Sequence, residues 1–341
     1  MTCLKDEHLT IPSLSAPLDV GGRTLRNRVV LAPMSGVTDL PFRDLAWRFG
    51  AGLVVTEMVA SRELALNARE SWSRIRNCGI RPHMVQLAGR EAHWMAEAAR
   101  IAEGEGADII DINMGCPAKK VIGGYSGSAL MRDPDHALGL IEATVGAVKV
   151  PVTVKMRLGW DHDSLNAPHI AARAEAAGAA MITVHGRTRM QFYEGKADWD
   201  AIRAVRDVLT IPLVANGDVD TAEDAREILR RSGADAVMVG RGAQGRPWHP
   251  AVLAGAAAHP STEEIAAVAV EHYRMMLDFY GVEAGLRHAR KHVGWYLERF
   301  APGFTGSAKA EIMTARDSDA VADRLATALL AGGAARLGEA A

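Results

Sequence analysis

The stretch ADIIDINMGCP, residues 107–117, decides how the rest of the chain is interpreted. Its apolar part, residues 107–112, predicts a buried strand, and the Gly-Cys-Pro sequence that follows predicts a turn. Cys116 is therefore expected just past the end of a strand, with Asn113 three residues before it. In parallel α/β proteins the carboxyl ends of the strands carry the chemistry. The stretch thus predicts a functional thiol at the end of a parallel strand.

Seven further apolar runs alternate with helical patterns along the chain, at a spacing of roughly 30 residues. Nearly continuous aliphatic runs of this kind are typical of parallel strands that are buried on both faces. The eight runs cover residues 28–34, 52–57, 83–87, 107–112, 151–157, 180–185, 212–216 and 236–240. Eight strand–helix units in about 240 residues predict a (β/α)8 TIM barrel. The alternative, an open doubly wound sheet, would need a Gly-x-Gly-x-x-Gly turn that no strand provides.

Glycine placement supports the alternation of strands and helices. A Gly-Ala pair precedes every second predicted strand, at residues 50–51, 106–107, 178–179 and 233–234. Glycine in such a place predicts a helix C-cap that leads directly into the next strand.

Beyond residue 258 the pattern changes to helices alone. Residues 259–264, His-Pro-Ser-Thr-Glu-Glu, predict a break followed by the capping box of a new helix. We therefore expect an α/β TIM-barrel domain over residues 1–258 and an all-helical domain over residues 259–330. The Gly/Ala-rich segment 331–341 is expected to be a disordered tail.

The bulk composition excludes several classes of protein. Apolar residues make up 48% of the 341 positions and charged residues 23%, as in ordinary globular proteins. The formal net charge of −2 argues against a strongly basic nucleic-acid-binding protein. Any basic surface that binds nucleic acid must therefore be a local patch. Three widely separated cysteines argue against disulfides and a metal site, and favour a reducing cytoplasm. We expect a monomeric cytoplasmic protein without a signal peptide or membrane contact.

Polar residues follow the predicted strands at their carboxyl ends, which in a barrel all face one mouth. An unpaired polar group on a buried strand costs about 1–3 kcal/mol, so the collected set indicates a binding site. The positions are Pro33, Met34, Ser35, Glu57, Gln86, Asn113, Cys116, Lys155, Arg157, His185, Arg187, Asn216, Gly217, Asp218, Gly240, Arg241 and Gly242.

The loops after the last two predicted strands, residues 216–218 and 240–242, predict a phosphate site. Their glycines leave backbone N–H groups accessible, and Arg241 adds positive charge. Ordinary turn glycines are the alternative. We expect a ligand with a phosphate at this end and a flat polar head elsewhere.

Lys155 has three interpretations: a Schiff-base lysine, a structural partner of Glu57, or a donor to an electron-rich heterocycle. The neighbouring polar set, Gln86 with Met34 and Ser35, favours hydrogen bonding to the pyrimidine edge of a flavin. The first interpretation would instead predict an aldolase.

Cys116 is either a small buried apolar residue or a reactive thiol in a loop. The flanking glycine and proline favour the loop, and residues 118–127 read as a mobile flap. Lys119 and Lys120 would lower the pKa of the thiol if they lay close to it. His185 is either a buried barrel histidine or, beside Arg187, a ligand contact.

These motifs together resemble the flavin-dependent tRNA-dihydrouridine synthases. They are Ala32-Pro33-Met34 with Thr38-Asp39, Gln86, Asn113-Met114-Gly115-Cys116-Pro117, Gly127-Ser128-Ala129-Leu130, Val154-Lys155-Met156-Arg157, His185-Gly186-Arg187-Thr188, Asn216-Gly217-Asp218 and Gly240-Arg241-Gly242. The match runs in order from Asn27 to Pro247, and residues 287–296 resemble the family's helical domain. The flap resembles the bacterial B-type branch, sometimes described as nitrogen-regulation-like.

The resemblance implies an FMN cofactor over the barrel mouth, NADPH as reductant and tRNA as substrate. The residues that it implies for FMN are Pro33, Met34, Ser35, Gln86, Lys155, His185, Asn216, Gly217, Asp218, Gly240 and Arg241. The residues that it implies for the tRNA are Asn113, Arg157, Arg187, Lys119, Lys120, Arg287, Arg290 and Lys291. Cys116 would act as the general acid, protonating uracil C5 while flavin N5 delivers hydride to C6.

Three other functions stay open at this point. A different FMN barrel oxidoreductase, similar to dihydroorotate dehydrogenase, would reduce a small molecule and leave the C-terminal helices without a use. A Schiff-base aldolase using Lys155 would be colourless. A tRNA-binding or regulatory protein on an inactive barrel is disfavoured by the presence of Cys116 and Lys155.

Overall fold

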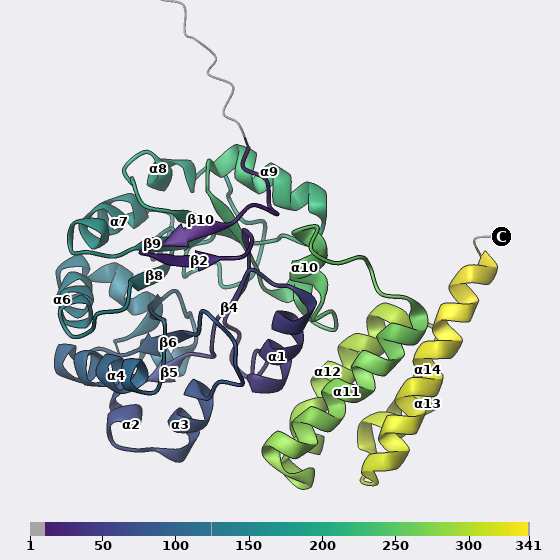
Figure 1. The fold of residues 1–341 in the computed structure, drawn as a ribbon. Helices are drawn as coiled ribbons and strands as arrows, with labels where there is room; N and C mark the ends of the chain where they lie inside the picture. Colours follow the sequence, from purple (N-terminus) through teal and green to yellow (C-terminus); the bar gives the residue numbers. More distant parts are fainter. Residues whose placement is uncertain (1–10, 124, 340–341) are drawn as a thin grey trace, which may run out of the picture.

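The computed structural model describes residues 11–123 and 125–339, and a closed parallel sheet forms its centre (Figure 1). The strands of this sheet are β3 (Val29–Leu31), β4 (Leu53–Val54), β5 (Val59–Ala60), β6 (Met84–Ala88), β7 (Ile109–Met114), β8 (Val152–Arg157), β9 (Met181–His185), β10 (Leu213–Asn216) and β11 (Ala236–Val239). They pair in the order β4-β3-β11-β10-β9-β8-β7-β6-β5. A parallel bridge between Val55, which follows β4, and Met84 of β6 closes the sheet. The predicted TIM barrel is therefore confirmed.

The second predicted strand, residues 52–57, is split into two short pieces. β4 pairs with β3, whereas β5 pairs with β6. Between the pieces, the Thr56 hydroxyl accepts the backbone N–H of Gln86 at 3.0 Å. The Gln86 N–H thus bonds to a side chain instead of to a backbone carbonyl of the neighbouring strand. The regular ladder of backbone hydrogen bonds is therefore interrupted at Thr56.

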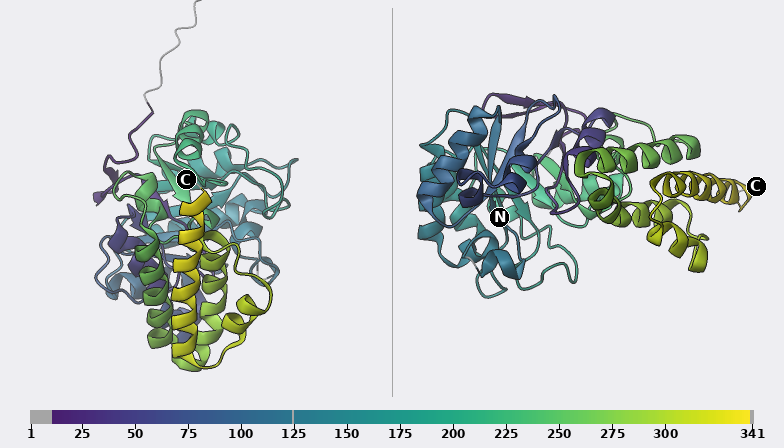
Figure 2. Two further views of the ribbon diagram at one scale, coloured as in Figure 1. Left: turned by 90° about the vertical axis from the view of Figure 1, so that its right-hand side faces the viewer. Right: turned by 90° about the horizontal axis from the view of Figure 1, so that it is seen from below.

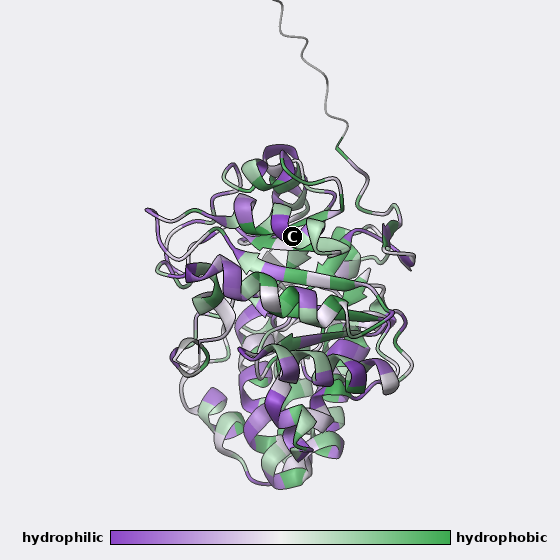
Figure 3. Ribbon diagram, turned by 90° about the vertical axis from the view of Figure 1, so that its left-hand side faces the viewer, coloured by the Kyte–Doolittle hydropathy of each residue, from purple (hydrophilic) through white to green (hydrophobic). Residues whose placement is uncertain are grey.

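Helices surround the sheet on its outer side. They are α1 (Leu40–Phe49), α2 (Ser61–Ala65), α3 (Arg69–Ile75), α4 (Ala92–Gly104), α6 (Pro134–Val145), α7 (Ala167–Ala176), α8 (Arg203–Arg206), α9 (Ala222–Ser232) and α10 (His249–Leu253). Coloured by hydropathy, the strands are mostly apolar and the outer helices carry both apolar and polar residues (Figure 3). Gly50 and Gly233 end α1 and α9 in the left-handed conformation, which confirms the predicted C-caps at these two positions.

A short hairpin that the periodicity did not predict closes the other end of the barrel. β1 (Leu18–Val20) and β2 (Arg23–Leu25) pair antiparallel. Their buried side chains share a core with residues at the amino-terminal ends of the barrel strands. The opposite end, where the predicted functional residues lie, stays accessible.

The chain ends in α11 (Thr262–Tyr280), α12 (Val282–Phe300), α13 (Gly306–Thr314) and α14 (Ser318–Glu339), which stand beside the barrel (Figures 1 and 2). The predicted capping box at the start of α11 is present at Ser261. The helices form their own apolar core. Trp248, which precedes α10, is buried in that core and packs against Phe300 with ring centroids 5.7 Å apart. The helices are thereby anchored to the last loop of the barrel.

α14 extends to Glu339, through most of the segment in which a disordered tail was expected. Two glycines within it pack closely against neighbouring helices. A Cβ on Gly332 would lie 2.7 Å from Ala301 Cα, and one on Gly333 would lie 2.7 Å from Thr262 Cβ. Small residues, which suggested disorder in the sequence, here permit close helix packing. Within the described part of the chain, no helix is both long and apolar enough to cross a membrane.

Candidate active site

A cavity of about 940 Å³ opens at the carboxyl ends of the barrel strands. Pockets of roughly 300–1,000 Å³ typically hold small ligands and cofactors. The predicted residues that line it are Pro33, Met34, Ser35, Gln86, Asn113, Cys116, Lys155, Arg157, His185, Asn216, Gly217, Asp218, Gly240, Arg241 and Gly242. Barrel closure therefore brings side chains from opposite ends of the domain sequence into one site.

Cys116 is held in a tight turn at the end of β7. The Asn113 side-chain oxygen Oδ1 accepts the backbone N–H groups of Gly115 and Cys116, at 3.1 and 3.0 Å. Ser128 donates to the Cys116 carbonyl from both its hydroxyl and its backbone N–H, at 2.9 and 3.1 Å. This is why an asparagine precedes the cysteine by three residues: its short side chain closes the turn that presents the thiol.

The Cys116 thiol is set to keep its proton. Burial raises its pKa above the ordinary value, and this effect outweighs the opposing hydrogen bond from the Ala118 backbone and the charges of Arg157 and Lys155. Lys119 lies exposed on the short helix α5 (Lys119–Ile122), outside the cavity wall. The Lys120 side chain is outside the described part of the structure. Near neutral pH the thiol is therefore protonated and can donate its proton. The surroundings do not favour the thiolate, which is the nucleophilic form.

Lys155 reaches the cavity from the middle of the barrel. Its Nζ donates to Asn216 Oδ1 at 3.3 Å, and Asn216 is itself oriented by donating to the Met238 carbonyl at 2.8 Å. Burial, and secondarily the charge of Arg157, lowers the Lys155 pKa to about 8. The Glu57 carboxylate instead accepts the backbone N–H of Gly36 at 2.5 Å. The partner that the structure gives Lys155 is thus Asn216, on β10, and the suggested pairing with Glu57 is not formed.

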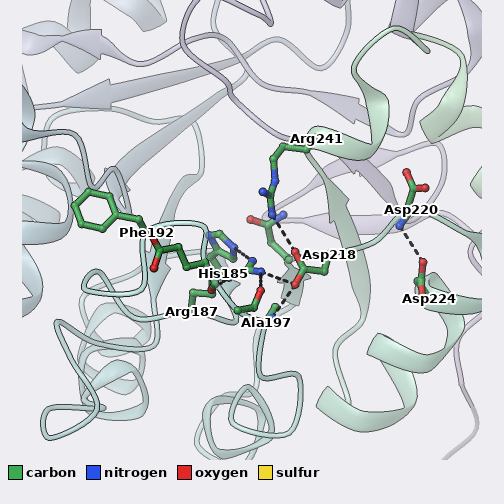
Figure 4. Close-up of polar contacts among 12 residues, drawn as sticks. His185, Arg187, Phe192, Ala197, Asp218, Asp220, Asp224 and Arg241 are labelled. Atoms are coloured by element: carbon green, nitrogen blue, oxygen red, sulfur yellow. Dashed lines mark hydrogen bonds and ion pairs between the residues drawn. The ribbon is translucent and has the colours of Figure 1, made fainter. Parts of the chain in front are cut away.

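Arg187, Asp218 and Arg241 form a bridged group at one end of the cavity (Figure 4). Asp218 Oδ2 accepts from Arg187 at 2.6 Å, while Asp218 Oδ1 accepts from Arg241 at 3.0 Å. Arg187 also donates to the carbonyls of Glu194 and Gly195, at 3.0 and 2.7 Å. Arg187 is buried behind the wall, whereas Arg241 lines the cavity. Arg241 is therefore placed to meet a ligand, and Arg187 is placed to support Asp218.

His185 lies beside this group as a neutral ring. Its Nε2 is 3.3 Å from an Arg187 nitrogen. Burial, together with the charges of Lys155, Arg157 and the neighbouring arginines, holds the His185 pKa well below its usual range. The positive charge at this end of the cavity thus comes from the arginines.

We expect Arg187→Met to lower the free energy of unfolding by about 3 kcal/mol, because it removes the buried partner of Asp218 and several charge-assisted hydrogen bonds. Urea unfolding of the purified variant measures this. Arg230→Met, which removes an exposed arginine paired with Glu227, is the matched control and should leave the midpoint unchanged. An unaltered midpoint for Arg187→Met would contradict the supporting role.

Several residues that line the cavity were not predicted from the sequence. Tyr193 is 54% exposed, and its ring centroid lies 5.5 and 5.3 Å from the guanidinium carbons of Arg157 and Arg241. Arg299 reaches the wall from α12 and donates to the Gln244 carbonyl at 2.7 Å. An aromatic residue in the loop after the sixth predicted strand could have signalled Tyr193. No local pattern signals Arg299, because it comes from a different layer of the fold.

The predicted basic residues of α12 lie in three different surroundings. Arg287 is exposed and pairs with Glu283 at 3.1 Å. Arg290 borders a small cavity among the C-terminal helices. Lys291 is half-buried against the barrel, and its Nζ would be 2.8 Å from a Cβ added to Gly36. Lys291 therefore contributes to the junction between α12 and the loop that leads to α1.

Comparisons with known proteins identify the family of this chain. The profile of the family described as dihydrouridine synthase (Dus) matches residues 30–330. A protein named probable tRNA-dihydrouridine synthase from Rhizobium leguminosarum bv. phaseoli is 76% identical over 309 residues, covering 91% of this chain and 97% of that protein. The protein named tRNA-dihydrouridine synthase B from Pseudomonas aeruginosa is 45% identical, covering 88% of this chain and 92% of that one.

Among solved structures, morphinone reductase aligns with a TM-score of 0.53 at 16% identity, covering 75% of this chain and 92% of its own. At that identity the likeness shows the barrel fold alone. The family match, by contrast, spans the barrel and the C-terminal helices together. It confirms the resemblance inferred from the motifs: this chain belongs to the dihydrouridine synthase family.

Proposed function

We propose that this protein is a tRNA-dihydrouridine synthase, which reduces the C5–C6 double bond of uridine in the D-loop of tRNA with the help of a flavin. One observation carries the proposal. A protonated thiol, Cys116, stands in the same cavity as an amide and ammonium set, Gln86, Asn113 and Lys155, that suits a flat polar ring. Family membership supports the same reaction.

The cavity fits FMN in size and in the arrangement of its charges. Arg241, at one end, suits the phosphate, and Gln86 with Lys155 suits the pyrimidine edge of the ring system. Gly217, in the cavity wall, packs too closely against its neighbours to carry a side chain, since a Cβ there would lie 2.7 Å from Ala197 Cβ and 3.0 Å from His185 Cδ2. Bound in this way, FMN would supply the hydride for uracil C6, and NADPH is the proposed source of that hydride.

The chain's own residues perform the proton step. Sγ of Cys116 donates its proton to C5 of the uracil, and the raised pKa keeps that proton on sulfur until it is needed. Asn113 is placed beside it to orient the base. The Lys155 ammonium stabilises negative charge that develops at the polar edge of the ring.

The uridine must leave its stack to reach a cavity at a barrel mouth, as for other enzymes that modify bases. Arg287 on α12, with Lys119 and Arg290, is proposed to contact the phosphate backbone of the tRNA. We expect binding of this kind to weaken as the salt concentration rises.

The decisive experiment uses tRNA from a strain that lacks dihydrouridine. We expect the purified protein to be yellow and to form dihydrouridine in that tRNA with NADPH, as detected by mass spectrometry, which also maps the modified position. A yellow protein that leaves the tRNA unchanged but reduces a free pyrimidine acid would favour the small-molecule alternative. A colourless protein that borohydride traps on a carbonyl substrate through Lys155 would favour the aldolase.

A further inference from the structure

A line of side-chain hydrogen bonds crosses three neighbouring strands beneath the cavity. The Thr153 hydroxyl on β8 donates to Asp111 Oδ1 on β7 at 2.6 Å, and Gln86 Nε2 on β6 donates to Asp111 Oδ2 at 2.6 Å. Asn113 Nδ2 donates to Gln86 Oε1 at 2.7 Å. Asn113 Oδ1 then accepts the backbone N–H of Cys116. The line thus runs from Thr153 to the turn that holds the thiol.

The strand register makes this line possible. Gln86, Asp111 and Thr153 are direct partners across β6, β7 and β8. Asp111 is 2% exposed, Gln86 1% and Thr153 0%. Because buried polar groups need partners, these side chains depend on one another.

The direction of every bond in the line is determined by its two ends. The backbone N–H of Cys116 can only donate, so Asn113 must turn its oxygen toward that group and its nitrogen toward Gln86. An ionised Asp111 can only accept, so Gln86 must turn its nitrogen toward it and its oxygen toward Asn113. Each amide nitrogen keeps one further hydrogen. Gln86 and Asn113 both lie in the cavity wall. The direction of the hydrogen bonds therefore makes these two amides donors, and not acceptors, toward a ligand.

We propose that Asp111 is a positioning residue that, through Gln86 and Asn113, holds the Cys116 turn and sets the donor order of the cavity wall. The Asn113 donor suits a carbonyl oxygen of uracil and disfavours the exocyclic amino group of cytosine, while the Gln86 donor suits a carbonyl oxygen of the flavin. This consequence rests on the proposed function, whereas the effect on the turn does not.

The charge state of Asp111 is compatible with this role. Burial raises its pKa to about 6, and the hydrogen bonds from Gln86 and Thr153 and the charge of Lys155 oppose the rise. The carboxylate is ionised at neutral pH, where it accepts from both neighbours.

Near-isosteric variants distinguish the effect of hydrogen-bond direction from the effect of side-chain packing. In Asp111→Asn, the new amide can give its oxygen to Gln86 and its nitrogen to the Thr153 hydroxyl, which can also accept, so the order survives. In Thr153→Val, the Asp111 carboxylate still accepts from Gln86. In the double variant D111N/T153V, the amide nitrogen has no acceptor at position 153, so it either stays unpaired or turns toward Gln86 and reverses the line.

The readout is the alkylation rate of Cys116 by iodoacetamide in the purified flavin-containing protein, resolved by mass spectrometry. Exposed Cys78 serves as an internal reference. We expect each single variant to stay within about twofold of wild type, and the double variant to react about tenfold faster because its turn is loosened. D111N/T153S, which keeps a hydroxyl, should behave like Asp111→Asn.

A rate in the double variant that equals the product of the two single effects would overturn the proposal, since packing alone predicts additivity. If circular dichroism shows that the double variant is unfolded, Gln86→Met breaks the same line at its centre. An unchanged Cys116 rate in Gln86→Met would then overturn the proposal. The alkylation result is independent of turnover, so absence of dihydrouridine would count against the proposed function alone.

Discussion

Cys116→Ala is expected to abolish dihydrouridine formation while leaving the flavin bound. Alanine removes the one proton donor placed at the end of β7, and loss of a general acid costs about 10²–10⁴-fold in rate. The Asn113 bonds to the turn use backbone N–H groups and survive the change. The measurement is dihydrouridine per tRNA over time, with the flavin absorbance of the same sample as the second readout.

Cys78→Ala is the matched control for this variant. Cys78 is exposed, and its thiol lies 3.3 Å from the Asp44 carboxylate, outside the cavity wall. We expect this control to turn over at the wild-type rate. A Cys116→Ala protein that also modified tRNA at the wild-type rate would show that the acid is another group.

Lys155→Met should weaken FMN binding and slow flavin reduction by NADPH by about 10²–10³-fold, because it removes a preorganised charge from a poorly solvated wall. Fluorescence titration measures the first effect and stopped-flow absorbance the second. The variant keeps most of the side-chain volume, so loss of charge is the principal change. Asn216 remains bonded to the Met238 carbonyl in the variant.

The wild-type protein should show a matching pH dependence. The Lys155 pKa is lowered to about 8, so the ammonium is present below that pH and is lost as the pH rises through it. FMN affinity of the apoprotein should therefore fall as the pH rises through about 8, and this step should be absent in Lys155→Met. Lys149→Met, at an exposed position just before β8, is the control that should retain the step. The same affinity and the same pH step in Lys155→Met would contradict an electrostatic role for Lys155.

The sequence predicted the barrel because each of its signals is local. An apolar run, a helix cap and a turn glycine each involve residues close in the chain, and their eightfold recurrence has few solutions other than a closed parallel barrel. The same logic failed where a distant group intervened. The second strand breaks because the Thr56 side chain takes a donor of Gln86, 30 residues away. The Gly332–Gly333 pair packs against other helices instead of fraying.

The grouping of the predicted site residues around one cavity could likewise be predicted from the sequence alone. Strand ends of a barrel share one mouth, so Cys116, Lys155 and Arg241 could be placed together from their positions in the chain. Which groups line the cavity was decided only by tertiary structure. Arg187 lies behind the wall because it pairs with Asp218, and Arg299 enters the wall from α12.

Asp111 shows the physical reason for this division. Asp111 lies in the stretch 107–117, yet its partners Gln86 and Thr153 are 25 and 42 residues away in the chain. Local propensity places each of these residues on a strand but cannot set the register between strands. Register and side-chain packing alone make them direct partners, and that contact orients the amides around Cys116.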